Sequence, residues 1–284
     1  MNILEGKKAL VTGGAMGIGL ATVKSLLALG CEVTIWDLNP EALTTAEKEL
    51  RKPGYSLHCH VCDISIEKHV KESARKAERE MGKVDILVNN AGCVVAGKFC
   101  SQEPHVWDRV TSVNLNSMYY TISALLPGMY ERNEGHIVNI SSGAGLTGMP
   151  DLAVYCATKW AVYGLTESLR MEAMVEGKTG VKFSSIHPGI LRHGMFEGSK
   201  FNLLGEILIP RVRNHDVIAR LIVEKAIRKN RSMLMTPWSL HLGPVIRAFL
   251  PDTVLARILL MAGAGTSMNG WTGRKGSAHA SPAH

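Results

Sequence analysis

Short apolar runs rich in β-branched residues alternate along the chain with longer segments in which apolar residues recur every three or four positions. Runs of the first kind predict strands and segments of the second kind predict helices. The predicted strands are residues 8–12, 32–36, 55–60, 84–89, 136–141 and 181–187, with 232–237 as one more. The predicted helices include 18–29, 41–50, 66–81 and 104–130, the stretch around 155–160, and the amphipathic segment 216–229.

Strand–helix alternation with uniformly apolar strands predicts an α/β fold. We expect a doubly wound parallel sheet of about seven strands, with helices on both faces. Because neither a repeat nor a linker divides the chain, residues 1–270 are predicted as a single domain. Within it, the glycine-punctuated segment 190–213 is predicted as the substrate loop and 237–264 as a C-terminal helical extension broken at Pro251. Residues 271–284, which are small and polar, are predicted as a disordered tail.

Composition narrows the class of protein. Hydrophobic residues make up 46% and charged residues 20% of the 284 positions, which is typical of a globular protein. Cys59 and Cys62 have the spacing of a zinc ligand pair, but no second such pair exists, so we expect reduced thiols, no metal and a cytoplasmic location. Neither a signal peptide nor a membrane-spanning run is predicted.

The basic charge is unevenly distributed. The net charge is +7, and residues 200–284 contain 12 Lys and Arg against 4 Asp and Glu. We do not predict nucleic-acid binding. An ordinary solvated surface is the simpler explanation, and the basic, apolar C-terminal region leaves open a peripheral contact with a membrane surface or a surface for oligomerisation.

A glycine-rich turn follows the first predicted strand and precedes a helix. Gly13, Gly17 and Gly19 would let the backbone approach a pyrophosphate at the helix N-terminus, although a purely structural turn is the alternative. Asp37 ends the second strand, where a carboxylate accepts the hydroxyls of an adenosine ribose and repels a 2′-phosphate. This position favours NAD over NADP, and the alternative is a helix cap.

The glycine spacing, T-G-x-x-x-G-x-G, resembles that of the short-chain dehydrogenase/reductase family. The resemblance covers about residues 6–190. Besides the glycine turn, it includes Asp63, "NNAG" at 89–92, "NISS" at 139–142, and "HPG" at 187–189. It also includes Asn114 and the pair Tyr155 and Lys159. It implies a Rossmann-type fold, an oxidoreductase activity, and a homodimer or homotetramer assembled through the fourth and fifth crossover helices. The segment 231–251 loosely resembles the retinol and 17β-hydroxysteroid dehydrogenase branch.

The resemblance also implies a set of cofactor-binding residues. Asp63 would contact adenine, with helix capping as the alternative. Asn89, Ala91 and Gly92 would line the adenosine–ribose side, and the "NNAG" segment would also stabilise the sheet; for Asn89 a turn-forming role is the alternative. The full set is Gly13, Gly17, Ile18, Gly19, Asp37, Leu38, Asp63, Ile64, Asn89, Ala91, Gly92, Tyr155, Lys159, Pro188, Gly189 and Ile190.

Four residues are candidates for catalysis. Tyr155 and Lys159 share a helix face, so the ammonium can lower the pKa of the phenol from about 10 toward neutrality and make it an acid/base. From spacing alone, a core aromatic residue and a solvated lysine would be the simpler interpretation. By resemblance Ser142 holds the substrate oxygen, Asn114 holds a water against the lysine, and Lys159 also binds the nicotinamide ribose. The threonine that often follows "PG" in the family is replaced by His193, which leaves the grip on the nicotinamide open.

The motifs leave the substrate, reaction direction, stereochemistry and oligomer number open. Apolar residues predicted to line the pocket favour a steroid, retinoid or long-chain alcohol or ketone. They are Leu146, Met149, Leu152, Phe196, Phe201, Leu203, Leu204, Ile207 and Leu208. The predicted function is therefore NAD-dependent interconversion of a lipophilic alcohol and its ketone or aldehyde. The alternatives are a reductase of a polar substrate, such as a 3-oxoacyl thioester or sugar, and a non-catalytic NAD-binding scaffold at a lipid surface.

Overall fold

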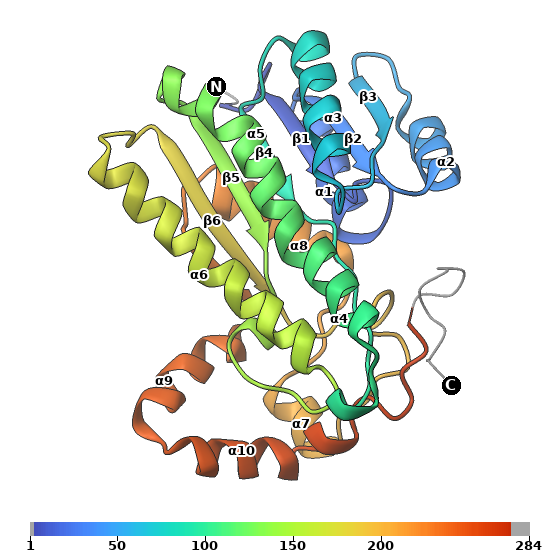
Figure 1. Cartoon of the computed structure of the whole chain (residues 1–284), viewed down its shortest axis with the longest axis vertical. Coiled ribbons are helices and arrows are strands. Elements are labelled where there is room, and N and C mark those ends of the chain that lie inside the picture. The colour runs from blue at the N-terminus through green and yellow to red at the C-terminus, as the bar shows by residue number, and fades with distance from the viewer. Residues whose placement is uncertain (1–2, 274–284) are drawn as a thin grey trace.

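The computed structural model describes residues 3–273 and contains one seven-stranded parallel sheet (Figure 1). The strand order is β3-β2-β1-β4-β5-β6-β7. The strands are β1 (Lys8–Thr12), β2 (Glu32–Asp37), β3 (Ser56–Val61), β4 (Ile86–Asn89), β5 (Gly135–Ile140), β6 (Val181–Pro188) and β7 (Met233–Thr236). The predicted strands are present, with bounds shifted by a residue or two.

Helices cover both faces of the sheet, as predicted. One face packs against α1 (Gly17–Ala28), α2 (Pro40–Leu50) and α8 (His215–Arg220). The other packs against α3 (Glu67–Met81), α5 (Ser117–Arg132) and α6 (Ala153–Val175). Burial of the strands between two helical layers explains why their sequences are continuous apolar runs.

The predicted helix 104–130 is not a single regular helix. It consists of α4 (Pro104–Thr111), a π-helical segment (Ser112–Asn116) and α5. A second π-helical segment, Leu221–Ile227, continues α8 within the amphipathic stretch predicted at 216–229. Single π turns inside helices are frequent at functional sites, and the first of these contains Asn114.

The strand order reverses between β1 and β4, because β2 lies on one side of β1 and β4 on the other. In open parallel sheets, ligands bind at the carboxyl ends of the strands beside such a reversal. The glycine turn follows β1, and Asp37 is the last residue of β2. The "NNAG" motif begins at the last residue of β4, and Ser142 lies just after β5. The fold therefore brings the predicted site residues to one edge of the sheet.

The C-terminal third adds short helices at one end of the molecule (Figure 1). They are α7 (Leu203–Leu208), α9 (Leu242–Phe249) and α10 (Asp252–Met261), and the break between α9 and α10 lies at Leu250 and Pro251. Trp271, the first residue of the predicted tail, packs against an apolar cluster. The rest of that predicted tail from 274 onward lies outside the described residues.

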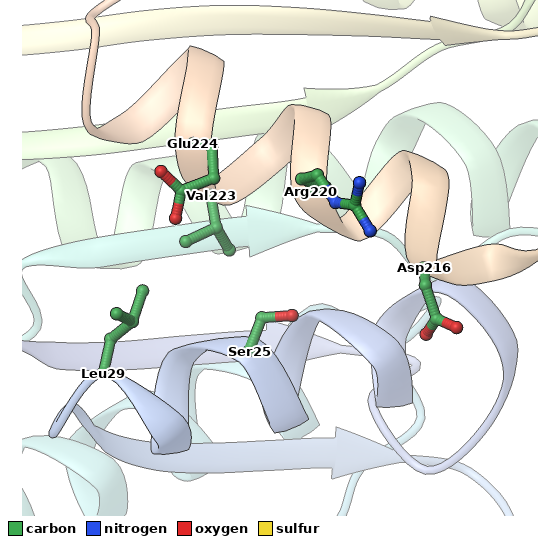
Figure 2. A pocket seen from close by; sticks show the side chains of 6 residues that line it. All are labelled: Ser25, Leu29, Asp216, Arg220, Val223 and Glu224. Atoms are coloured by element: carbon green, nitrogen blue, oxygen red, sulfur yellow. The ribbon is translucent and has the colours of Figure 1, made fainter.

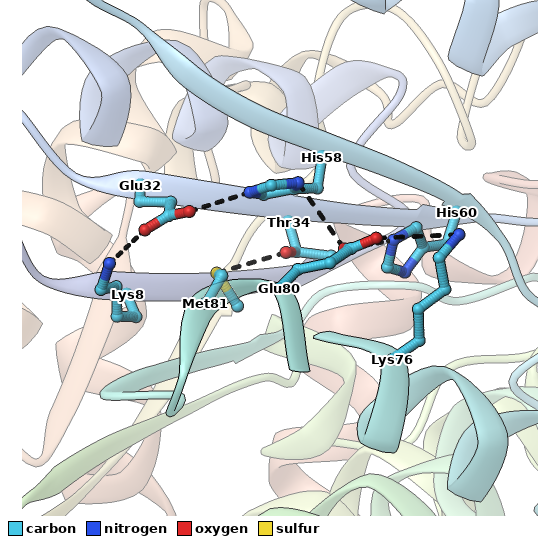
Figure 3. A network of polar contacts seen from close by, with 8 residues as sticks. All are labelled: Lys8, Glu32, Thr34, His58, His60, Lys76, Glu80 and Met81. Atoms are coloured by element: carbon cyan, nitrogen blue, oxygen red, sulfur yellow. Dashed lines mark hydrogen bonds and ion pairs between the residues drawn. The ribbon is translucent and has the colours of Figure 1, made fainter. Parts of the chain in front are cut away.

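A polar network lies between β1–β3 and the end of α3 (Figure 3). Glu32 accepts from Lys8 and lies 2.9 Å from His58 Nε2, while Glu80 lies 2.8 Å from His60 Nε2. The carboxylates of Glu32 and Glu80 therefore both have hydrogen-bonding partners, as partly buried charged groups require.

Candidate active site

The glycine turn between β1 and α1 depends on the absence of side chains. Gly13 and Gly17 have φ angles of 59° and 58°, in the left-handed region that favours glycine. A Cβ added at Gly19 would lie 2.1 Å from the carbonyl oxygen of Gly13. Only glycine therefore allows the turn to close this tightly.

Asn90 clamps this turn and was not among the residues identified from the sequence. Its side-chain amide donates to the carbonyl oxygens of Thr12 and Gly13, each at 3.0 Å. In return, the Thr12 hydroxyl accepts from the backbone N–H groups of Asn90 and Ala91 at 3.0 and 3.1 Å. The "NNAG" motif pointed to this segment of the chain, but only the structure shows which of its residues holds the glycine turn.

The N-terminus of α1 fits a phosphate. Its N-cap residue, Met16, makes no side-chain capping hydrogen bond, and the first turn contains no acidic residue. By contrast, Asn39 caps α2. The N–H groups and the positive dipole end of α1 are thus suited to the pyrophosphate of a dinucleotide.

Asp37 lies at the end of β2, beside this turn. Its carboxylate accepts from the backbone N–H groups of Ala15 at 3.2 Å and Asn39 at 3.1 Å. The side chain is 8% exposed, and the neighbouring Leu38 is 52% exposed. These bonds fix the carboxylate beside the glycine turn at the carboxyl end of β2.

Asn89 does not have a side chain available for a cofactor. Its amide donates to Asn139 Oδ1 at 2.9 Å and its oxygen accepts from Thr121 at 2.8 Å. The residue is 2% exposed. The side chain therefore links β4 to β5 and α5, as expected for the segment's role in the sheet, and the lining of the ribose side by Asn89 stays a prediction for its backbone.

Asp63 makes a local turn. Its Oδ1 accepts from the backbone N–H of Ser65 at 3.0 Å and from the Ser65 hydroxyl at 2.6 Å. The N-cap residue of α3 is Ile66, so Asp63 is not the helix cap itself. Ile64, next to it, is 8% exposed.

Tyr155, Lys159 and Ser142 come together at the carboxyl end of β5. The Lys159 Nζ lies 5.7 Å from the centroid of the Tyr155 ring and donates to the carbonyl oxygen of Ile140 at 3.0 Å. Tyr155 and Lys159 are each 4% exposed, and Ser142 is 8% exposed. The three residues form one buried polar group beneath apolar side chains.

The pKa of Tyr155 is not lowered in this structure. Burial raises it, and the hydroxyl of Ser142 opposes that shift only in part. Burial also lowers the pKa of Lys159 to about 8, because desolvation disfavours the ammonium. The expected shift of the phenol toward neutrality is therefore reversed here, since desolvation by burial is the largest cause and favours the neutral phenol.

Asn114 is completely buried in the π-helical segment, and its amide is engaged at both ends. It donates to the carbonyl oxygen of Cys93 at 2.9 Å and accepts from the backbone N–H of Cys93 at 2.8 Å. A Cβ at Gly92 would lie 3.2 Å from Asn114 Oδ1 and 3.6 Å from Lys159 Nζ. Gly92 therefore leaves space beside the lysine.

Residues 188–190 connect β6 to the substrate loop. The Gly189 N–H donates to the carbonyl oxygen of Thr236 at 2.6 Å, and Ile190 accepts from the Val212 N–H at 2.9 Å. A Cβ at Gly189 would lie 2.8 Å from Pro237 Cδ. The side chain of His193 is exposed.

An apolar cluster covers Tyr155. Phe196 contacts the tyrosine ring edge-on, with centroids 5.6 Å apart. The cluster consists of Val94, Leu152, Tyr155, Cys156 and Met268, with Ala96, Ala144, Met149, Met195, Phe196 and Trp271 packed against it. Of the predicted wall residues, Met149, Leu152 and Phe196 are present, whereas the side chains of α7 are exposed.

The surface hollows lie elsewhere. One is lined by Ser25 and Leu29 of α1 and by Asp216, Arg220, Val223 and Glu224 on the opposite helix (Figure 2). Another is lined by residues of 198–202 and 266–270. Neither lining includes Tyr155, Lys159 or Ser142, which lie beneath the apolar cluster.

The sequence model described as short chain dehydrogenase matches residues 7–201. The chain belongs to the short-chain dehydrogenase family. It is 32% identical to Epidermal retinol dehydrogenase 2 of Homo sapiens over 249 residues. This alignment covers 87% of this chain and 79% of that protein. It is 33% identical over 253 residues to Estradiol 17-beta-dehydrogenase 11 of Rattus norvegicus, covering 89% and 82%.

Solved short-chain dehydrogenases have the same fold. A metagenomic short-chain oxidoreductase in complex with NADP is 30% identical, with a TM-score of 0.68 and coverage of 82% of this chain and 97% of that one. A short-chain dehydrogenase/reductase from Burkholderia phymatum in complex with NAD is 26% identical, with a TM-score of 0.77 and coverage of 89% and 96%. The chain is therefore an oxidoreductase of this family that acts on CH–OH groups, and the expected fold and family branch are confirmed.

Proposed function

We propose that this short-chain dehydrogenase uses NAD to interconvert a lipophilic alcohol and its ketone or aldehyde. The observation that supports it most directly is the buried group of Tyr155, Lys159 and Ser142 beneath an apolar cluster. The polar group suits a carbinol or carbonyl oxygen, and the apolar cluster suits the rest of a steroid, retinoid or long-chain molecule.

In the proposed mechanism Ser142 holds the substrate oxygen and Tyr155 exchanges its proton. A protonated Tyr155 gives its proton to a carbonyl oxygen during reduction, and the phenolate removes the alcohol proton during oxidation. Lys159, as the ammonium, stabilises the phenolate. The dinucleotide, when bound, supplies or accepts the hydride.

Asn114 has a positioning role in this proposal. Its amide binds the backbone of Cys93 at both ends, so its side chain holds the segment after "NNAG" beside Lys159. The relay water expected at Asn114 would therefore have to bind the backbone or a remaining lone pair of its side chain. Lys159 would also bind the nicotinamide ribose, as the family resemblance implies.

The cofactor proposal rests on Asp37 and the N-terminus of α1. The turn 13–19 would surround the pyrophosphate, Asp37 would accept both ribose hydroxyls, and Asp63 and Ile64 would contact the adenine. Ala91 and Gly92 would line the adenosine–ribose side, and the backbone of 188–190 would line the nicotinamide half. A 2′-phosphate beside the Asp37 carboxylate would be repelled, which favours NAD over NADP.

A test of the function measures NADH formation with a panel of steroids, retinoids and long-chain alcohols. Tyr155→Phe should leave NAD binding intact and lower turnover by about a hundredfold or more, because the proton donor is lost. Unchanged turnover would contradict the mechanism. Faster turnover with NADP would contradict the role of Asp37.

The alternatives give different outcomes in the same assay. A polar-substrate reductase would reduce a 3-oxoacyl thioester or a sugar in preference to the lipophilic panel. A scaffold would bind NAD and turn over none of these substrates. The apolar cluster over Tyr155 argues against the first alternative and the complete polar group argues against the second.

Exposed apolar side chains on the C-terminal helices favour contact of the protein with a lipid surface. On α9, Leu242, Val245 and Phe249 are 45%, 55% and 83% exposed. Arg247 of the same helix lies 4.9 Å over the Trp160 ring, donates to the carbonyl oxygen of Leu146 at 3.3 Å and pairs with Asp252, although its side chain stays 38% exposed. This helix therefore exposes its apolar side chains while its single charged side chain is engaged by neighbouring residues.

A similar arrangement is present on α7. Leu203 and Ile207 are 80% and 68% exposed, while Glu206 pairs with Arg211, which donates to the carbonyl oxygen of Ser199. Trp238, which is 72% exposed, adds an aromatic ring of the kind enriched at membrane interfaces. No helix among residues 3–273 is long and apolar enough to span a bilayer.

We propose that α7, α9 and α10 lie on a phospholipid surface, in a cytoplasmic protein that binds it peripherally. Arg247 and Arg257 lie on α9 and α10 themselves, whereas the four basic residues of 225–231 precede β7. Attachment should therefore rest mainly on burial of the exposed apolar side chains, with attraction to anionic lipid as a second contribution.

Flotation with phosphatidylcholine vesicles tests this surface. Phe249→Ser and Val245→Ser should reduce the bound fraction severalfold, whereas Val61→Ser, at a residue 60% exposed on β3, should leave it unchanged. Absence of flotation would overturn the proposal. A change of oligomeric state in the Phe249 variant would assign the face to contact with a second copy.

The proposed homodimer or homotetramer uses other surfaces. The family resemblance points to the fourth and fifth crossover helices, which are α5 and α6. Tyr119 on α5 is 46% exposed, and Met171 on α6 is 63% exposed. Light scattering would give the oligomer number.

A further inference from the structure

The C-terminal segment 262–273 lies across the substrate loop. The Lys200 N–H donates to the carbonyl oxygen of Ser267 at 2.8 Å, and the Thr272 N–H donates to the carbonyl oxygen of Glu197 at 2.9 Å. The indole of Trp271 donates to the carbonyl oxygen of Met195 at 3.0 Å. These bonds join two segments about 70 residues apart in the chain into one cover.

The two segments are also matched in shape. A Cβ added at Gly198 would lie 1.9 Å from the carbonyl oxygen of Gly270, so the backbones approach as closely as glycine permits. At the other end of the cover, the Asn202 amide donates to the carbonyl oxygen of Met261 at 2.7 Å. The cover is therefore held along its length rather than at a single point.

The inner side of this cover contacts the apolar cluster over Tyr155. Met268 is 7% exposed and belongs to that cluster, and Trp271 packs against it together with Met195 and Phe196. Because Tyr155 is only 4% exposed, a substrate oxygen reaches the phenol only when side chains of this cluster move aside. The substrate then occupies space bounded by the cover.

We propose that Met268 and Trp271 form the outer wall of the substrate site and determine its preference for long apolar substrates. The inference rests on the proposed function and adds a wall contributed by the end of the chain. A thioether and an indole offer apolar area, and the indole N–H is already bonded to Met195. This wall offers no free charge for a polar substrate.

The test compares reduction of methyl ketones from acetone to a long-chain member, with NADH in excess. Trp271→Ala should lower kcat/KM for the long ketone by about tenfold, mainly through KM, because apolar contacts in a pocket are lost. The value for acetone should change less than about twofold. Trp238→Ala is the matched control, since this exposed tryptophan lies in the same third of the chain but outside the cluster.

A binding measurement separates this inference from the proposed function. The long ketone should change the tryptophan emission of the NADH-free protein, and Trp271→Phe should abolish most of that change while retaining the ring. Unfolding temperature and NAD affinity verify that the variants are folded.

If the wild type turns over none of the ketones, the proposed function fails, and the emission change still decides whether Trp271 contacts the ligand. An unchanged ratio of long-chain to acetone kcat/KM in folded Trp271→Ala would overturn the inference. An emission change retained in Trp271→Phe would do the same.

Discussion

Two buried histidines should make the protein acid-sensitive well above the pH at which carboxylates are protonated. His136 is 6% exposed and bonded to Ser184, and His187 is completely buried and bonded to Ser185 and to the Ser142 carbonyl. Burial lowers the pKa of each from 6.5 to about 4. The folded state therefore prefers both imidazoles neutral.

The sign and size of the effect follow from these values. An unfolded chain takes up protons near pH 6.5, whereas the folded protein takes them up near pH 4, so stability is complete above 6.5 and falls between 6.5 and 4. At pH 5 each histidine should cost about 2 kcal/mol relative to pH 7.5, and the pair about 4 kcal/mol. That loss is a large share of the total stability of a typical domain.

Urea unfolding at pH 7.5 and pH 5 measures the loss directly. His136→Gln can keep a hydrogen bond to Ser184 but has no proton to gain, so its loss of stability between the two pH values should be about 2 kcal/mol smaller than that of the wild type. The variant is compared only with itself at the two pH values, which cancels any cost of the substitution. An equal pH dependence in the variant and the wild type would refute the argument, as would a wild-type loss below about 1 kcal/mol.

Three further outcomes follow from the site. Gly19→Ala should abolish dinucleotide binding, measured by calorimetry, because the Cβ would lie 2.1 Å from the carbonyl oxygen of Gly13. Asp37→Ser should raise the NADP to NAD ratio of kcat/KM by at least about tenfold, because repulsion of the 2′-phosphate is removed; an unchanged ratio would contradict it. Asn139→Ala should lower the free energy of unfolding by about 1–3 kcal/mol in denaturant titration, because the Asn89 amide loses its acceptor; a cost near zero would argue against that bond.

The sequence predicted those features that depend on local pattern. The apolar runs of the strands and the glycine turn were visible because burial on both faces and a left-handed φ restrict the residue types. Tyr155 and Lys159 followed from helical spacing together with the family motif. Both lie in the buried group near Ser142, as the pattern indicated.

Other features depend on tertiary contacts that no local pattern records. The burial of Tyr155 reverses its expected pKa shift, because desolvation is decided by residues remote in sequence. Met268 and Trp271 were missed since only the folded chain brings them to residues 195–200. The sequence also could not distinguish Asn90, which holds the glycine turn, from Asn89, which holds the sheet.

The π-helical segment Ser112–Asn116 takes up one extra residue between α4 and α5. A π turn holds one more residue than an α turn, so deleting a single residue there would restore regular helix and leave α4 in nearly the same phase relative to α5. The packing of α4 against α6 would then be retained, whereas the bulged backbone that carries Asn114 to Cys93 would be lost. The extra residue therefore serves the position of Asn114 rather than the packing of the two helices.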